Sequence, residues 1–105
     1  MDVSSSAYLQ QAKHIVTQQL AKHRVDAYLF GSRAKGTATR YSDIDIALLP
    51  KAPIPAILAS DLKEALEEST IPYYVDVVDL STVSENFRKK VLQEGILWHD
   101  SSKNK

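Results

Sequence analysis

Two aspartates that alternate with large apolar residues are the part of this sequence best suited to chemistry. Asp43 and Asp45 flank Ile44, and Ile46 follows, which is the period-2 pattern of a strand with one buried face. Both carboxylates therefore point to the same side, with Cα atoms roughly 7 Å apart. They can reach one metal ion, or two ions about 4 Å apart. Carboxylate oxygens suit Mg²⁺ or Mn²⁺ better than Zn²⁺.

A glycine-serine turn upstream strengthens this interpretation. Taken alone, two alternating aspartates are more commonly the solvated side of a half-exposed strand. Here an apolar run ends at Phe30, and Gly31 and Ser32 follow with a short segment that can start a helix. Backbone amides at such a strand-to-helix turn bind anions. The combination predicts a site for a phosphate and a divalent metal.

The same turn is close to a P-loop but does not match it. A P-loop requires Gly, four residues and then Gly-Lys-Ser/Thr. In this chain Lys35 precedes the second glycine, and Thr37 follows Gly36 directly. We therefore reject the P-loop.

These residues resemble the signature of the nucleotidyltransferases related to DNA polymerase beta, which reads Gly-Ser, a basic segment, Gly, a short loop and Asp-x-Asp. The matching residues are Gly31, Ser32, Gly36, Ser42, Asp43 and Asp45. In detail the chain is similar, over essentially its whole length, to the minimal nucleotidyltransferases. These are small prokaryotic antitoxin-type partners of HEPN-domain proteins.

The family takes a third carboxylate from a later strand, and two aspartates are candidates. Asp76 lies between valines in mid-strand, where an acid without a task would be costly to bury. The resemblance also favours Asp76. Asp79 lies three residues further on, so it faces the other side of a regular strand. A turn or cap before a helix that begins near Ser81 is the simpler role for Asp79.

The resemblance implies in-line attack of a hydroxyl on the α-phosphate of a nucleoside triphosphate, with ATP as the expected donor of AMP. It implies two Mg²⁺ ions, with Mn²⁺ as an alternative, held by Asp43, Asp45 and Asp76. Asp76 would also help to deprotonate the hydroxyl. Gly31 and Ser32 would hold the β- and γ-phosphates.

Other polar residues of the loop receive weaker assignments. Lys35 matches a family position that is usually basic and can contact the triphosphate. Ser42 can contact phosphate or brace the start of the strand. Arg33 and Arg40 are explained at least as well as solvated side chains.

Three aromatic residues could stack on a base. They are Tyr73, Tyr74 and Trp98. Strand aromatics belong more often to a core or an interface.

Composition bounds the remaining possibilities. A chain of 105 residues makes one domain, and a chain of this size buries about 65% of its unfolded surface. Thirteen basic residues balance thirteen acidic ones, so we expect no strong nucleic-acid binding. The chain has no cysteine, no apolar signal segment and no run long enough to span a membrane. We expect a cytoplasmic protein without a membrane partner.

Hydrophobic periodicity and turn residues predict an α+β fold in a single domain over residues 1–105, with a small mixed sheet and helices packed on one face. Ser4 to Ser6 can cap a first helix that runs to Leu20. Strands are expected at 25–30, 43–49 and 73–79, helices at 54–69 and 82–94, a C-cap at Gly95, a short strand at 96–98 and a disordered tail at 100–105.

Three functions remain open. The first is transfer of a nucleoside monophosphate to a hydroxyl on a HEPN-type toxin, since a chain this short has no room for an acceptor-binding domain. The second is a catalytically silent module that neutralises its partner by binding; three like charges held together argue against it. The third is a small-molecule nucleotidyltransferase, whose pocket would require a homo-oligomer. Nucleotide preference and oligomeric state are not predicted.

Overall fold

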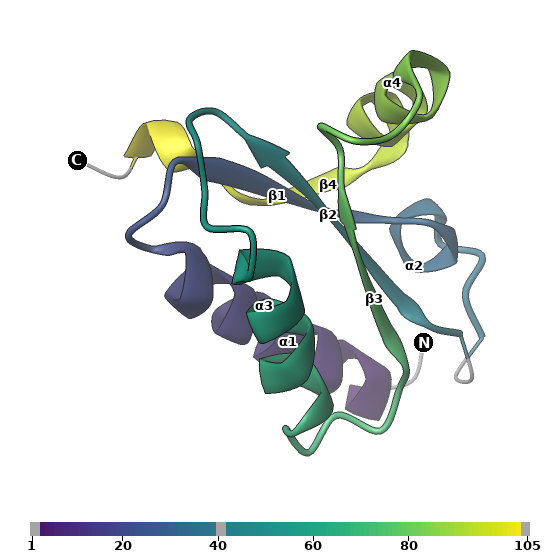
Figure 1. Ribbon diagram of the computed structural model, residues 1–105. Helices are drawn as coiled ribbons and strands as arrows, with labels where there is room; N and C mark the ends of the chain where they lie inside the picture. Colours follow the sequence, from purple (N-terminus) through teal and green to yellow (C-terminus); the bar gives the residue numbers. More distant parts are fainter. Residues whose placement is uncertain (1–2, 40–41, 104–105) are drawn as a thin grey trace.

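The computed structural model describes residues 3–39 and 42–103, which build a four-stranded sheet with strand order β3-β2-β1-β4 (Figure 1). β1 pairs antiparallel with β2 and β4, whereas β2 and β3 pair in parallel. The predicted α+β class and mixed sheet are confirmed. The elements are α1 (Val3–Leu20), β1 (Val25–Phe30), α2 (Ser32–Lys35), β2 (Ile44–Pro50), α3 (Leu58–Glu67), β3 (Val75–Asp79), α4 (Glu85–Glu94), β4 (Ile96–His99) and the 3-10 helix η1 (Ser101–Lys103).

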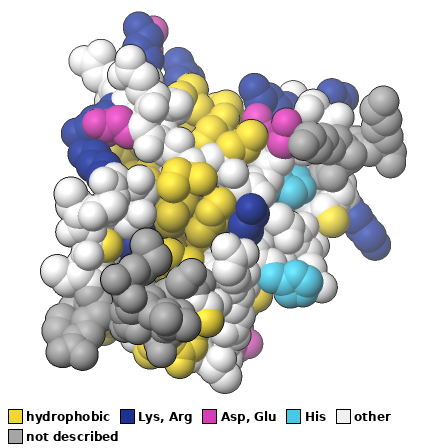
Figure 2. All heavy atoms as spheres, turned by 180° about the vertical axis from the view of Figure 1, so that it is seen from behind, with side chains coloured by type: hydrophobic (Ala, Val, Ile, Leu, Met, Phe, Trp, Pro, Cys, Tyr) yellow, Lys and Arg dark blue, Asp and Glu magenta, His cyan; other side chains and the backbone are white. Residues whose placement is uncertain are grey.

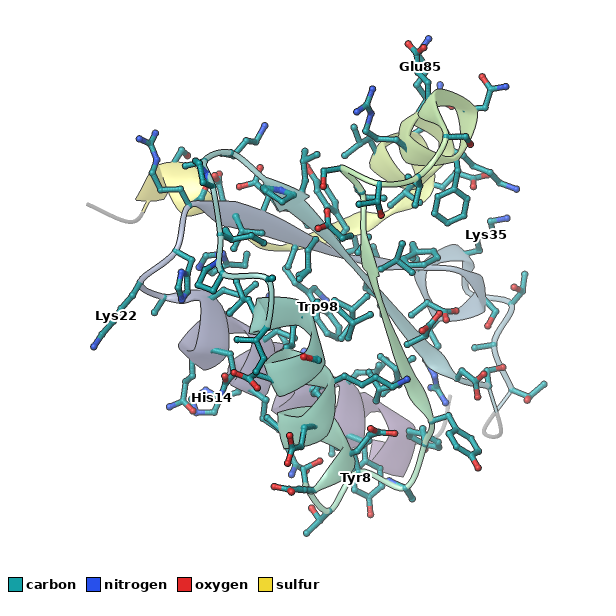
Figure 3. The ribbon with its side chains drawn as sticks, viewed as in Figure 1. Tyr8, His14, Lys22, Lys35, Glu85 and Trp98 are labelled. Carbon is teal, nitrogen blue, oxygen red and sulfur yellow. The ribbon has the colours of Figure 1, made fainter. Side chains whose placement is uncertain are left out.

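Two long helices cover one face of the sheet. α1 and α3 lie side by side beneath it (Figure 1), and their apolar stripes pack on the inward positions of the central strands. Trp98 packs against this core and is drawn near its middle in Figure 3. It is therefore a packing residue and not a stacking platform for a base. The largest fully buried side chains of this core are Leu20, Ile44, Ile46, Leu48, Leu62 and Leu66.

The last helix packs on the opposite face. Ala47, Leu80 and Val91 form a second buried cluster there. Phe87 of α4 meets Phe30 of β1 edge to face, with ring centroids 5.8 Å apart. The expectation that helices cover one face therefore holds for α1 and α3 but not for α4. The alternating pattern predicted only one buried face, whereas Ala47 on the other face is also fully buried.

Helix boundaries differ from the predicted ones for local reasons. α3 begins at Leu58, directly after a turn in the proline-rich segment in which the Leu58 amide donates to the Pro55 carbonyl. α4 begins only at Glu85, where the Ser84 hydroxyl accepts from the Phe87 amide at 3.2 Å. Gly95 caps the C-terminus of α4, as predicted.

At both ends of the described chain, the structure differs from what the sequence predicts. α1 already includes Val3, so Ser4 to Ser6 lie within the helix instead of preceding it. Residues 100–103 are ordered, since buried Ser101 donates from its amide and its hydroxyl to Asp26, each at 2.8 Å. Within the described part of the chain, none of the helices has the length and apolar character needed to cross a membrane.

Candidate active site

The register of β2 and β3 places two of the three candidate carboxylates directly beside each other. Asp45 pairs with Asp76 across the parallel ladder, and neighbouring strands lie about 4.8 Å apart. Asp43 and Asp76 are exposed and Asp45 is half-buried. All three are on the side of the sheet that does not carry α1 and α3, because they alternate with the buried Ile44, Ile46 and Val75.

The carboxylates are close enough to influence one another's protonation. Burial raises the pKa of Asp45 above its ordinary value, and the negative charges of Asp76 and Asp43 raise it further. Like charges held together without compensation are an arrangement that cations relieve. The site is therefore electrostatically suited to a cation.

The glycine turn adjoins this group. Phe30 pairs with Asp45 across β1 and β2, so Gly31 follows at the end of β1 beside the carboxylate. Gly31 has φ 77° and ψ −156°, a conformation that essentially only glycine adopts. A Cβ atom at this position would overlap the Asp45 carboxylate. Glycine thus allows the backbone of the turn to approach the acid closely.

Arg33 has a positioning role that the sequence did not reveal. Its side chain is buried, and Nε and Nη2 donate to the Ser42 carbonyl at 3.0 and 2.7 Å. Its guanidinium lies 4.2 Å from the centre of the Tyr73 ring. The solvated alternative for Arg33 is wrong, because this side chain ties the loop after α2 to the segment before β3. Arg40 lies outside the described residues.

Ser42 and Lys35 each have a partner in the structure. The Ser42 hydroxyl accepts from the Thr39 amide at 2.9 Å, so it braces the loop before β2. Lys35 extends from α2 toward α4 (Figure 3) and forms an ion pair with Glu94 at 3.6 Å. No local pattern predicts this pair, since its members are far apart in the sequence.

Asp79 has the turn role that the sequence favoured for it. Its carboxylate accepts from the Ser81 amide at 2.8 Å and from the Ser81 hydroxyl at 2.6 Å. Its register partner is Leu48, not Asp45. Of the two candidates for a third acid, only Asp76 lies beside Asp45.

A metal ion would need ligands beyond these side chains. Among residues 3–39 and 42–103, no group of three or more His, Cys, Asp or Glu side chains is arranged to hold a metal ion. Mg²⁺ commonly takes one or two carboxylates together with substrate phosphates and water, instead of a cage made by the protein alone. The Asp45 and Asp76 pair beside the glycine turn fits that second kind of site.

Comparison with known proteins decides the family. The family model described as "Polymerase beta, Nucleotidyltransferase" matches residues 10–104. The chain belongs to this nucleotidyltransferase family. The resemblance carried by the Gly-Ser turn and the paired aspartates is thereby confirmed, and so is the expectation of an enzyme family that uses nucleotides.

Relatives of this nucleotidyltransferase fall within the minimal group. "Probable protein adenylyltransferase MntA" of Haemophilus influenzae is 35% identical over 103 residues, covering 98% of this chain and 88% of the relative. A crystal structure of a toxin-antitoxin with AMP-PNP is 31% identical with a TM-score of 0.67, covering 84% of this chain and 73% of that one. An MNT antitoxin complex with the tri-AMPylated HEPN toxin of Shewanella oneidensis is 26% identical with a TM-score of 0.62, covering 90% of this chain and 74% of the matched one.

Proposed function

We propose that this nucleotidyltransferase transfers AMP from ATP to a hydroxyl group of a HEPN-type toxin and so acts as its antitoxin. The observation that carries the proposal is the side-by-side register of Asp45 and Asp76 next to Gly31. A partner that neutralised a toxin by binding alone would gain nothing from this costly arrangement of charges. The relative named as an adenylyltransferase and the complex with an AMPylated HEPN toxin support the same substrate and acceptor.

Each residue of the site has a proposed task. The turn amides of Gly31 and Ser32, with Lys35, bind the β- and γ-phosphates. Asp45 and Asp76 lie where the α-phosphate and the attacking hydroxyl meet. The hydroxyl oxygen forms a bond to the α-phosphorus, the bond from that phosphorus to the bridging oxygen breaks, and pyrophosphate leaves. Asp76 accepts the hydroxyl proton.

Divalent cations complete the proposed site. Asp45 and Asp76 would hold Mg²⁺ together with the substrate phosphates, and Asp43, two residues before Asp45, would join them once the nucleotide is bound. The ion when bound would offset the charge of the phosphates and of the leaving pyrophosphate. The fit rests on the hard oxygen donors and on the raised pKa of Asp45, which burial raises most and the negative charges of Asp76 and Asp43 raise further.

The test is transfer of label from [α-³²P]ATP, in the presence of Mg²⁺, to the HEPN-domain product of the neighbouring reading frame. We expect the wild-type chain to label this protein and Asp43→Asn/Asp45→Asn to reduce the rate by about 100-fold or more. A matched pair identifies the third acid. Asp76→Asn should abolish labelling, whereas Asp79→Asn should retain it, since Asp79 caps a turn.

Two results would contradict the proposal. One is the absence of any labelled acceptor together with full neutralisation of the toxin by the Asp43→Asn/Asp45→Asn chain, which would establish a pure binding module. The other is labelling of a small metabolite but not of the protein acceptor.

A further inference from the structure

The site residues lie on successive strands of the sheet, and their order indicates from which side the attacking hydroxyl approaches. The register aligns Phe30 of β1, Asp45 of β2 and Asp76 of β3 in one row, and Gly31 follows Phe30 at the end of β1. With the phosphate tail at the turn after β1, the α-phosphate lies over Asp45. The attacking hydroxyl must then come from the opposite side of the α-phosphate, which is the side of β3. β3 is an edge of the sheet, so this side is open to a partner.

Tyr74 is the conspicuous side chain at that edge. It is 79% exposed and immediately precedes buried Val75, so it projects to the same side as Asp76. Its backbone is held in place, because the Ile44 amide donates to the Tyr74 carbonyl at 2.8 Å. The adjacent Tyr73 is half-buried and packs edge to face on Tyr8, which Figure 3 shows at the lower end of the molecule. Tyr73 therefore anchors the segment and leaves Tyr74 outside it.

We infer that Tyr74 is a contact residue for the acceptor protein and that the acceptor docks over the β3 edge with a basic segment. This inference rests on the proposed function and adds the surface through which the acceptor is recognised. A rigid aromatic side chain with one polar tip is typical of residues that contribute strongly to protein interfaces.

Charge at this edge supports a basic occupant. Asp43 and Asp76 are exposed beside Tyr74. α3 packs against the face of β3 opposite Asp76, where exposed Glu67 ends the helix and exposed Glu68 follows it. Within residues 3–39 and 42–103, neither glutamate forms an ion pair. Bound Mg²⁺ would offset the charges of Asp43 and Asp76, so Glu67 and Glu68 are the carboxylates that would attract a basic segment of a partner bound over the β3 edge.

An exposed apolar surface lies on α4 and β4, at the edge of the sheet opposite β3. Figure 2 shows hydrophobic side chains gathered in the middle of the back of the molecule. The exposed large hydrophobic residues of α4 and β4 are Phe87, Leu92, Ile96 and Leu97. β4 is separated from β2 by β1, on the side of the phosphate tail. A partner docked there would not face Asp76. Leu97 is therefore a suitable control position.

The experiment measures transfer of AMP to the same HEPN-domain protein by four variants, together with the affinity of each variant for ATP. Tyr74→Ala should lower kcat/KM for the acceptor by about tenfold or more, with ATP affinity unchanged within about twofold. Tyr74→Phe should retain most activity, because the ring is kept. Leu97→Ala, at the opposite edge, should behave as wild type.

Reversing the charges of Glu67 and Glu68 tests the docking inference independently of Tyr74. Glu67→Lys/Glu68→Lys should raise KM for the acceptor by about tenfold at low ionic strength and by less at high ionic strength. Glu85→Lys, at the far end of the molecule in Figure 3, should leave KM unchanged.

The outcomes separate the two proposals. If the wild-type chain labels no acceptor, the proposed function fails and the docking inference fails with it. If wild type is active and Tyr74→Ala equals it, or if Leu97→Ala alone loses transfer, only the docking inference is overturned. Loss of ATP affinity in Tyr74→Ala would make Tyr74 a base-stacking residue. AMP found on Tyr74 itself by mass spectrometry would make it an acceptor. Either result overturns the docking inference.

Discussion

Gly31 is packed so closely against Asp45 that a single methyl group on its Cα would overlap the carboxylate. Two constraints meet at this residue, because its backbone also has a φ of 77°. The turn that would bind phosphate and the acid that would bind metal are therefore one compact unit. A change in either one displaces the other.

Gly31→Ala should show both consequences. We expect a loss of about 1–3 kcal/mol in the free energy of unfolding from backbone strain, and a fall in transferase activity of about 100-fold because Asp45 is displaced. Gly36→Ala is the matched control, since Gly36 also has a positive φ of 76° but has no atom within 4 Å of an added Cβ. Urea unfolding and the AMP transfer assay measure the two effects. Equal activity loss in both variants would argue against the contact with Asp45.

Stability should depend on pH through Asp45. Because the pKa of Asp45 is raised in the folded state, its contribution to stability is fully present below pH 3.8, the ordinary value, and is lost as the pH rises through the folded pKa. Without metal at pH 7, Asp45→Asn should therefore melt at a higher temperature than wild type. The difference should shrink toward pH 4. Asp76→Asn should lower the folded pKa of Asp45, because it removes one repelling charge. The loss of stability with rising pH should then occur at lower pH. A difference independent of pH would contradict this prediction.

The ion pair between Lys35 and Glu94 should compete with nucleotide binding. Glu94→Gln releases Lys35 and should tighten ATP binding by about twofold, as expected for a pair that is largely exposed. Lys35→Ala should weaken ATP binding by about tenfold. In the Lys35→Ala background, Glu94→Gln should have no further effect. Isothermal titration of the four chains tests this, and equal effects of Glu94→Gln in both backgrounds would refute it.

The C-terminal turn should contribute to stability. Removing residues 101–105 leaves Asp26 without the two Ser101 donors, and we expect a loss of about 1–3 kcal/mol in the free energy of unfolding. Removing only Asn104 and Lys105 keeps both hydrogen bonds and should have no such effect. The midpoint of urea unfolding distinguishes the two chains. Equal midpoints would mean that Ser101 does not stabilise the fold.

The features that could be predicted from the sequence are those that depend on neighbouring residues. The alternation at Asp43 and Asp45 correctly oriented β2, and the Gly-Ser turn correctly ended β1 after Phe30. Features that depend on contacts between distant segments could not be predicted. Arg33 looked solvated because its partners, Ser42 and Tyr73, are brought to it only by the folded sheet.

The same limit explains the remaining differences. The ordered C-terminal turn depends on Asp26, which is remote in sequence, and its polar residues resembled a frayed end. The position of α4 on the second face depends on the contact of Phe87 with Phe30. The pairing of Asp45 with Asp76 was anticipated through the resemblance, whereas its physical basis is the parallel register.

The parallel register also determines where related sequences can accept insertions and deletions. The spacing between Asp45 and Asp76 comes from the backbone pairing of β2 with β3, in which each aspartate is the second residue of its strand, and not from the shape of the side chains beneath them. The connection over residues 51–74 can therefore lengthen, shorten or change composition while the two acids keep their separation. A single residue inserted between Ile44 and Asp45 would instead turn the acid into the core. Insertions should thus accumulate in the crossover and be excluded from the strands.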